Sequence, residues 1–305
     1  MKHLLSSKEL SRVEIEALLD LAQSFLPTVR NKEALEIAKG KILATLFFEP
    51  STRTRFSFET AMLRLGGSVI SNGTMKETSS DKKGETLFDT GKVVSAYANI
   101  IAMRHPISGS VPALAEGSDV PVMNGGDGPA DHPTQGLLDL LTIQLHLGRL
   151  DGFTFMGLGD MKYSRVVHSD VTLLSNFGPS KFIFVTPPEL AMPQEYVDLL
   201  ESKGHTVEQH SDMEAGLKEA DVVTQTRVQA ERFPSEAEYL KHKGIYVIGK
   251  EQMEQMKEDS ILMHPLPRID EILPEVDSDP RAKYFEQVSN GVAIRMAIIA
   301  YLLDL

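Results

Sequence analysis

Short apolar runs alternate with helical patterns along this chain, and the alternation limits the fold more than any other feature. The runs are apolar at nearly every position, which predicts strands that are buried on both faces. Such strands, each followed by a helix, are typical of parallel sheets flanked by helices. The predicted strands are 42–48, 100–103, 120–123, 153–158, 182–185, 221–224 and 261–263, and the predicted helices include 56–65, 87–98, 133–147 and 165–177.

The length of the chain predicts two domains. Its 305 residues are enough for two domains of ordinary size. The composition shifts after the predicted helix 133–147, which indicates a junction there. We therefore expect an α/β fold with a first domain over 1–148 and a second over 149–290. An apolar helix within 291–305 is expected to pack back on the first domain.

Composition narrows the class of protein. A net charge of −12 argues against non-specific binding to nucleic acid or to an anionic membrane. The first residues turn polar too soon for a signal peptide, and no apolar run is long enough to span a bilayer. We expect a soluble, cytoplasmic protein. The lack of cysteine excludes disulfides, thiolate metal sites and a cysteine nucleophile.

The segment after the first predicted strand is rich in hydrogen-bond donors. The hydroxyl residues Ser51, Thr52 and Thr54 alternate with Arg53 and Arg55 just before a helical pattern. The free N–H groups of a helix start attract anions, and the planar guanidinium matches phosphate oxygens. Ordinary capping by a serine would explain one hydroxyl but not five consecutive donor side chains. The segment therefore predicts a phosphate site.

Polar clusters follow other predicted strands as well. Arg104 follows strand 100–103, and the segment 264–268 follows strand 261–263. Ligands of open α/β sheets bind beyond the carboxyl ends of the strands. We therefore expect these clusters and the arginine-rich segment to contribute to one pocket.

The segment His132-Pro133-Thr134-Gln135 opens a predicted helix, because proline suits the first helical position. An imidazole at the cap could polarise a carbonyl group, and the glutamine amide could hold an NH2 group. A purely structural cap explains the segment equally well.

Two arginines in the second half of the chain follow strand ends. Arg165 lies early in a predicted helix, and Arg227 and Gln229 follow strand 221–224. Single surface arginines are usually solvated, but two at separate strand ends fit the capture of a dicarboxylate. Gly157 and Gly159 give only part of a dinucleotide fingerprint, so a nicotinamide cofactor has weak support. No histidine or carboxylate spacing indicates a metal site, and no Gly-x-Ser-x-Gly motif indicates a hydrolase.

Taken together, these motifs resemble those of the aspartate/ornithine carbamoyltransferases. Four segments occur in the family's order: Ser51–Arg55, Met103–Pro106, His132–Gln135 and His264–Pro267. The segments around Arg165 and Arg227 are similar to the aspartate branch, catalytic chain. The ornithine branch typically carries His-Cys-Leu-Pro where this chain has His264-Pro265-Leu266-Pro267.

The resemblance implies a role for each matching residue. The catalytic residues would be Arg53, Thr54, Arg104 and His132, and carbamoyl phosphate would be bound by Ser51, Thr52, Arg53, Thr54, Arg104, His132, Gln135 and the carbonyl groups of Leu266 and Pro267. Aspartate would be bound by Lys83, Arg165, Arg227 and Gln229. The first domain would then be the carbamoyl phosphate-binding domain and the second the aspartate-binding domain.

The resemblance also implies an assembly and a pathway. A homotrimer with shared active sites is expected, in which Ser79 and Lys83 enter the neighbouring site. The charged segment 72–82 departs from the family pattern, so Ser80 is the alternative to Ser79. The reaction would serve pyrimidine biosynthesis with no cofactor or metal. Whether regulatory chains bind stays open.

Three alternatives to this interpretation exist. The acceptor could be another amine such as ornithine, although a cationic side chain would need a carboxylate partner where this chain offers Arg165 and Arg227. A non-catalytic anion-binding protein could use the same fold. An NAD-dependent dehydrogenase is the most distant alternative, because the glycine fingerprint is incomplete.

Overall fold

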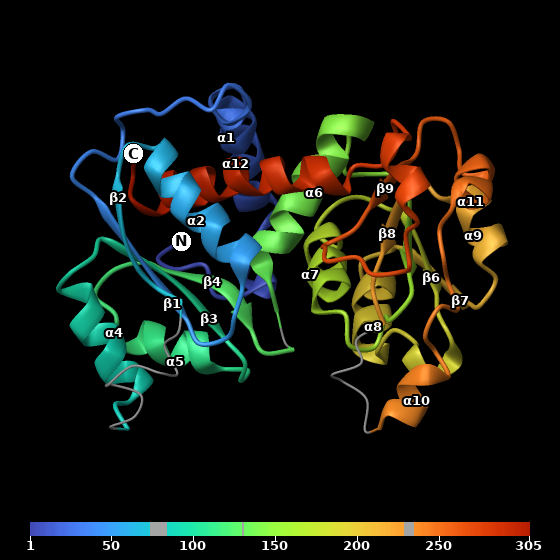
Figure 1. Cartoon of the computed structure of the whole chain (residues 1–305), viewed down its shortest axis with the longest axis horizontal. Helices are drawn as coiled ribbons and strands as arrows, with labels where there is room; N and C mark the ends of the chain where they lie inside the picture. The colour runs from blue at the N-terminus through green and yellow to red at the C-terminus, as the bar shows by residue number, and fades with distance from the viewer. Residues whose placement is uncertain (74–83, 130, 229–234) are drawn as a thin grey trace. The chain divides into compact units, whose positions relative to one another are not determined.

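The structure is a computed structural model of the 305-residue chain and describes residues 1–73, 84–129, 131–228 and 235–305. The chain divides into two compact units, which are described separately (Figure 1). Unit 1 comprises Met1–Leu141 and Val288–Leu305, and unit 2 comprises Thr142–Gln287. Two parallel sheets flanked by helices confirm the predicted α/β class.

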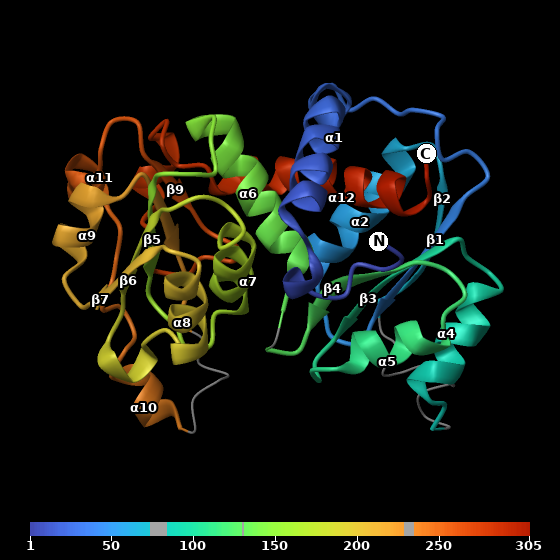
Figure 2. The same cartoon turned by 180° about the vertical axis from the view of Figure 1, so that it is seen from behind.

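Unit 1 contains a four-stranded parallel sheet in the order β2-β1-β3-β4. Helices α4 and α5 cover one face, where apolar residues of β1 and β3 pack against α5 (Figure 1). The returning part of α12 lies in the same unit as α1 and α2, as expected for the helix within 291–305 (Figure 2). The elements are α1 (Arg12–Arg30), β1 (Ile42–Phe47), α2 (Thr52–Arg64), β2 (Ser68–Asn72), α4 (Leu87–Ser95), β3 (Ile100–His105), α5 (Ser110–Gly117), β4 (Val122–Asp127), the first part of α6 (Pro133–Leu147) and most of α12 (Tyr284–Leu302).

Unit 2 contains a five-stranded parallel sheet in the order β7-β6-β5-β8-β9. Apolar residues of β5, β6 and β8 form a core with α9 and α11. Its elements are β5 (Thr154–Leu158), α7 (Arg165–Leu174), β6 (Lys181–Val185), α8 (Gln194–Ser202), β7 (Thr206–His210), α9 (Met213–Glu219), β8 (Val222–Gln225), α10 (Glu236–Leu240), α11 (Lys250–Gln255) and β9 (Ile261–Met263).

The sequence patterns missed two strands, β2 and β7. Both lie at the edge of a sheet, and both expose several of their side chains. An edge strand that is open to solvent needs no continuous apolar run, so it carries little of the signal that identified the buried strands. The seven predicted strands are all present, with bounds that shift by up to two residues except at the end of β4, which extends four residues further than predicted.

Helix α2 begins earlier than predicted. We expected the helix at residue 56, but it begins at Thr52. The donor-rich segment is therefore the first turn of the helix itself. No helix in the described part of the chain is long and apolar enough to cross a membrane.

Candidate active site

The sheet register of unit 1 brings the arginine-rich segment beside Arg104. Phe47 in β1 lies opposite Arg104 in β3, and the chain turns into α2 immediately after β1. The Nε of Arg104 lies 2.5 Å from Oε1 of Glu49, within that turn. The expected meeting of these two strand ends is therefore present in unit 1.

No side chain at the N-cap position caps the first turn of α2. Ser51 is the N-cap residue with extended dihedrals (φ −156°, ψ 99°), but its side chain makes no capping hydrogen bond. The first turn contains no acidic side chain. Since the alternative of simple serine capping required that bond, the geometry favours an anion at this helix start.

Three arginines of unit 1, Arg53, Arg104 and Arg295, interact electrostatically. Partial burial, together with the positive charge of Arg104, lowers the pKa of Arg53, although the residue as a whole remains exposed. The pKa of Arg295 is lowered to about 9, chiefly by burial, with Asp139 opposing the shift and the positive charge of Arg104 adding to it. The positive charge of Arg104 therefore contributes to the lowered pKa of both Arg53 and Arg295. A bound anion would relieve this repulsion between like charges.

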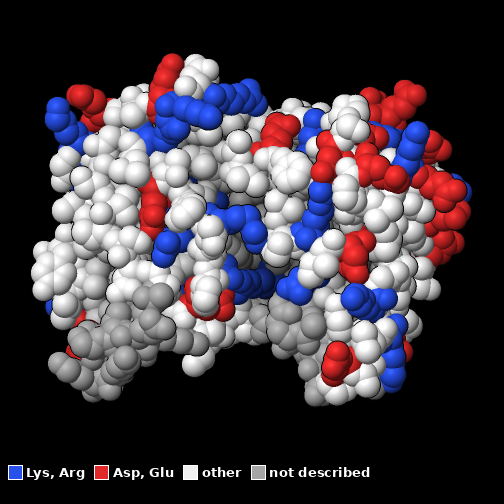
Figure 3. Space-filling model, viewed as in Figure 1, with Lys and Arg blue, Asp and Glu red and all other residues white. Residues whose placement is uncertain are grey.

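The positive charge of this region is local. The chain carries a net charge of −12, and acidic side chains gather at the edge of unit 2 formed by α9 and α11 (Figure 3). The protein as a whole therefore does not attract anions. Positive charge is concentrated locally, on the arginines that the fold brings together in unit 1.

His132 occupies the cap of α6, as the sequence predicted. Its carbonyl oxygen accepts hydrogen bonds from the backbone N–H groups of Gln135 (2.9 Å) and Gly136 (3.2 Å). The imidazole is 4% exposed, and its Nδ1 lies 3.5 Å from Oγ1 of Thr134. The backbone carbonyl of His132 thus accepts the first hydrogen bonds of α6, and the imidazole is buried beside Thr134.

Asp139 orients the side chain of Gln135. Nε2 of Gln135 donates to the two carboxylate oxygens of Asp139 at 3.2 and 3.3 Å. Because a carboxylate only accepts hydrogen bonds, the amide oxygen of Gln135 must point away from it. That oxygen is then available to an NH2 donor.

Sequence reasoning missed Asp139 and Arg295. Both are nearly or fully buried in unit 1, at 0% and 3% exposure. Each is a charged residue that interrupts an apolar run of a helix, α6 or the later part of α12. Such an interruption was the available signal, since charged side chains are almost never fully buried without a partner.

Unit 2 holds the two arginines predicted to bind a dicarboxylate. Arg165 is the first residue of α7, and Arg227 lies two residues after β8. Both side chains are half-buried. Their elements follow β5 and β8, which are neighbours in the sheet.

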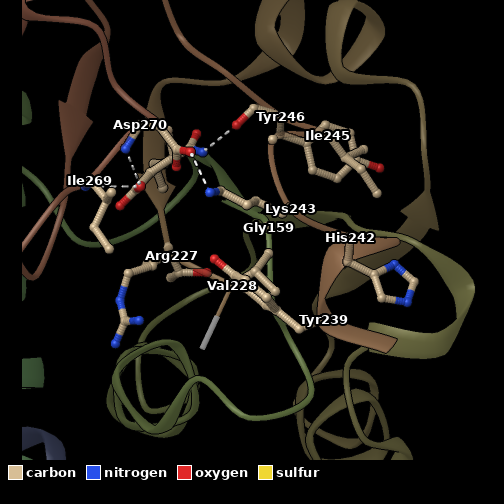
Figure 4. A pocket seen from close by; sticks show the side chains of 14 residues that line it. Gly159, Arg227, Val228, Tyr239, His242, Lys243, Ile245, Tyr246, Ile269 and Asp270 are labelled. Atoms are coloured by element: carbon tan, nitrogen blue, oxygen red, sulfur yellow. Dashed lines mark hydrogen bonds and ion pairs between the residues drawn. The ribbon is translucent and has the colours of Figure 1, made fainter. Parts of the chain in front are cut away.

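Arg227 also lines a cavity in unit 2, together with Lys243 and Asp270 (Figure 4). Nζ of Lys243 lies 3.9 Å from Oδ2 of Asp270. Figure 4 shows the Arg227 side chain directed away from this ion pair, so its guanidinium is not part of it. The neighbouring Gly159 (φ +112°) is required sterically, because a Cβ there would lie 2.4 Å from the carbonyl oxygen of Thr226. This close approach accounts for a glycine that also resembled a dinucleotide motif.

The segment 264–267 forms a tight turn directly after β9. Its Leu266 has a φ of +54°, in the left-handed region that a leucine rarely adopts. The backbone N–H of Leu266 donates to Nδ1 of His264 at 2.8 Å. The turn is therefore held by a side chain of its own first residue.

Family comparison identifies both halves of the chain. Residues 2–145 match the carbamoyl phosphate-binding domain of the aspartate/ornithine carbamoyltransferases. Residues 151–302 match the aspartate/ornithine-binding domain of the same family. The chain belongs to the aspartate/ornithine carbamoyltransferase family. The resemblance found in the sequence motifs is thereby confirmed.

Relatives with aspartate carbamoyltransferase names align over almost the whole chain. The catalytic subunit of that name from Archaeoglobus fulgidus is 49% identical over 300 residues, which is 98% of each chain. The one from Methanocaldococcus jannaschii is 47% identical over 304 residues, covering 100% of this chain and 98% of the relative.

Solved structures of carbamoyltransferases have the same fold. The M. jannaschii catalytic subunit superposes with a TM-score of 0.92 at 47% identity, covering 100% of this chain and 98% of that chain. An aspartate transcarbamoylase from Trypanosoma cruzi, in complex with carbamoyl phosphate and aspartate, superposes with a TM-score of 0.90 at 39% identity. That alignment covers 98% of this chain and 95% of the other.

Several residues expected from the carbamoyltransferase pattern lie outside the described residues. These are Ser79, Ser80, Lys83 and Gln229. Among the residues that are described, no group of histidine and carboxylate side chains could hold a metal ion.

Proposed function

We propose that this protein transfers the carbamoyl group of carbamoyl phosphate to the amine of L-aspartate, giving N-carbamoyl-L-aspartate and phosphate. One observation carries the proposal. The uncapped start of α2 lies beside Arg104, which acts electrostatically on Arg53. These groups would form an anion site on the half of the chain that matches the carbamoyl phosphate-binding domain.

Carbamoyl phosphate would be held by two sets of groups. Ser51, Thr52, Arg53 and Thr54 would bind the phosphate, and Arg104 would bridge the phosphate and the carbonyl oxygen. The amide NH2 would donate to Gln135, whose oxygen is turned outward by Asp139, and to the carbonyl groups of Leu266 and Pro267.

The reaction would proceed by direct attack. The aspartate amine attacks the carbamoyl carbon and forms a tetrahedral oxyanion, and phosphate then leaves. Donors from Thr54, Arg104 and His132 would face that oxyanion, where the loss of one donor typically costs about 3–4 kcal/mol. The leaving phosphate can accept the proton of the amine, so no protein base is required. The site brings two anionic substrates together and so supplies the proximity that the reaction needs.

Aspartate would be bound by the second domain. The two arginines Arg165 and Arg227 supply planar groups suited to its two carboxylates, and Gln229 and Lys83 would complete the site. The arginines argue against ornithine, whose cationic side chain would need a carboxylate partner. We propose 1–148 with the returning helix 291–305 as the carbamoyl phosphate domain, and 149–290 as the aspartate domain.

The assembly would be a homotrimer in the cytoplasm, serving pyrimidine biosynthesis. The neighbouring subunit would contribute Lys83 together with Ser79 or Ser80. Mixing inactive Lys83→Ala and Arg53→Ala chains should then restore part of the activity. Mixed trimers that form without any recovery would contradict a shared site.

A product assay tests the proposal directly. The protein is incubated with carbamoyl phosphate and either aspartate, ornithine or putrescine, and each carbamoylated product is quantified. We expect product from aspartate alone. Product from ornithine without product from aspartate would refute the assignment, and no product with any amine would favour a non-catalytic anion-binding protein.

A further inference from the structure

We infer that His264 and Glu271 act as positioning residues, which hold the turn 264–267 so that its carbonyl groups select an NH2 group over a methyl group. The inference rests on the proposed function, because it deepens the role of Leu266 and Pro267. Neither His264 nor Glu271 would touch the substrate. Both would act through the backbone of the turn.

The imidazole of His264 is fixed from both sides. Its Nδ1 accepts from the backbone N–H of Leu266 at 2.8 Å, and its Nε2 lies 2.8 Å from Oε1 of Glu271. A backbone N–H can only donate, so Nδ1 must be unprotonated and Nε2 must carry the proton. The side chain is 1% exposed. A neutral imidazole in a single tautomer therefore joins the turn to Glu271.

The second carboxylate oxygen of Glu271 binds backbone groups of the same loop. Oε2 accepts from the backbone N–H groups of Ile269 (3.1 Å) and Asp270 (3.2 Å). Burial alone would raise the pKa of Glu271, but the hydrogen bond from His264, together with backbone hydrogen bonds that include the one from Ile269, lowers it overall. Glu271 is 6% exposed, so an ionised carboxylate sits beneath the loop with both of its oxygens bonded.

The backbone of His264 and of Glu271 also forms hydrogen bonds to other segments. The N–H of His264 donates to Oε1 of Gln287 at 2.9 Å. The carbonyl of Glu271 accepts from the N–H of Ile248 at 2.8 Å. The loop 264–271 is therefore anchored at both ends to other parts of unit 2.

Leu266 shows why the turn needs this support. Its φ of +54° places a side chain with a Cβ in a region that favours glycine. The hydrogen bond to His264 fixes the N–H of this residue and, with it, the direction of the adjoining peptide groups. Without the bond, the backbone could leave the left-handed region and turn the carbonyl groups of residues 266 and 267.

Those carbonyl groups provide a means of discrimination. A carbonyl oxygen only accepts hydrogen bonds. It can therefore bind the NH2 of carbamoyl phosphate, but it forms no hydrogen bond with the methyl of acetyl phosphate. The two molecules share the phosphate and the carbonyl group. A site whose acceptors lose their partner rejects the analogue strongly. Correct placement of the turn should therefore affect the affinity for carbamoyl phosphate and not the affinity for acetyl phosphate.

The test compares the affinities of carbamoyl phosphate and acetyl phosphate, measured by titration calorimetry on the full-length protein and three variants. His264→Ala removes both bonds. His264→Asn retains an oxygen that can accept from the N–H of Leu266, in the manner of an Asx-turn. Glu271→Gln keeps an acceptor for His264 but removes the charge. The control is His146→Ala, because His146 pairs with Glu286 at 3.1 Å on a more exposed part of unit 2.

We expect His264→Ala to weaken carbamoyl phosphate binding by about tenfold to a hundredfold, the range set by losing one or two hydrogen bonds. Acetyl phosphate binding should change by less than about twofold, since its phosphate contacts are unaffected. His264→Asn should recover part of the loss, Glu271→Gln should give an intermediate loss, and His146→Ala should match the wild type.

Two results would overturn the inference. Equal weakening of both ligands, or unchanged affinity for both in folded His264→Asn and Glu271→Gln, would show that the pair does not position the turn. A separate result bears on the proposed function. If the wild type itself does not prefer carbamoyl phosphate, the assignment of the carbonyl groups is wrong, and the inference fails with it.

Discussion

Nη2 of Arg295 donates to Oγ1 of Thr134 at 3.1 Å, which links α12 to the first turn of α6. Nη1 of the same guanidinium donates to Oγ of Ser57 at 3.1 Å and to the carbonyl oxygen of Gly291 at 2.9 Å. Its Cζ lies 4.9 Å from the ring centroid of Phe58. The buried guanidinium on α12 thus contacts both α2 and α6 within unit 1.

Replacing Arg295 with methionine should strongly destabilise unit 1. The substitution removes these contacts and leaves the buried carboxylate of Asp139 without its neighbouring positive charge. Breaking a buried charge pair on one side typically costs about 3–5 kcal/mol. Urea unfolding measures the change. Arg12→Met is the control, because Arg12 forms an exposed pair with Glu16 that is worth about 1 kcal/mol or less. A similar small effect for Arg295→Met would contradict the prediction.

Arg53→Ala should abolish most activity and leave the fold intact. The residue is exposed, so its loss creates no cavity, but it removes a guanidinium from the proposed phosphate site. Loss of such a charge-assisted contact should reduce kcat/KM by about a hundredfold or more. Arg64→Ala is a matched control in the last turn of the same helix, where Arg64 binds the carbonyl oxygen of Glu33. Near-normal turnover by Arg53→Ala would mean that the phosphate assignment is wrong.

Arg227→Lys should raise the KM for aspartate while leaving the affinity for carbamoyl phosphate unchanged. Lysine keeps the positive charge but cannot form the planar, two-pronged contact with a carboxylate. An increase of about tenfold is expected from the loss of one such contact. Steady-state kinetics with each substrate varied in turn provides the measurement. Loss of carbamoyl phosphate binding instead would place Arg227 in the other half of the site.

The ion pair between Arg268 and Asp277 should make stability depend on acid pH. Hydrogen bonding to Arg268 lowers the pKa of Asp277, and Nη2 of the arginine lies 2.7 Å from Oδ2 of the carboxylate. A lowered folded-state pKa means that the contribution is complete above the unfolded value of about 4 and is lost as the pH falls through the folded value. The stability difference between wild type and Asp277→Asn should therefore be greatest near neutral pH and shrink at low pH. If the ion pair did not contribute, unfolding curves from neutral to acid pH would show the same difference in unfolding free energy between the wild type and Asp277→Asn at every pH.

Buried features of this fold could be predicted from the sequence, whereas features that depend on distant pairings could not. The inner strands carry continuous apolar runs, which the sequence patterns identified. The edge strands β2 and β7 lacked that signal because their side chains face solvent. The donor-rich segment 51–55 could be proposed as a phosphate site from the sequence because its donors are adjacent in the chain.

Supporting contacts of the site were not predictable in the same way. The sequence placed His264 at a strand end, but its pairing with Glu271 depends on how the intervening loop folds. Arg295 and Thr134 are 161 residues apart, so only the tertiary structure joins them. Local patterns indicate which residues could contact a ligand, whereas the groups that orient those residues come from elsewhere in the fold.

The return of α12 to unit 1 has a consequence for synthesis on the ribosome. Residues 142–287 form one uninterrupted stretch, whereas unit 1 needs both its early residues and Val288–Leu305. Unit 2 can therefore finish folding as soon as it has left the exit tunnel. The nascent unit 1 must wait, with the space for Arg295 unfilled, until the whole of unit 2 has been translated. We expect chaperones to meet this chain chiefly through its earliest-made part.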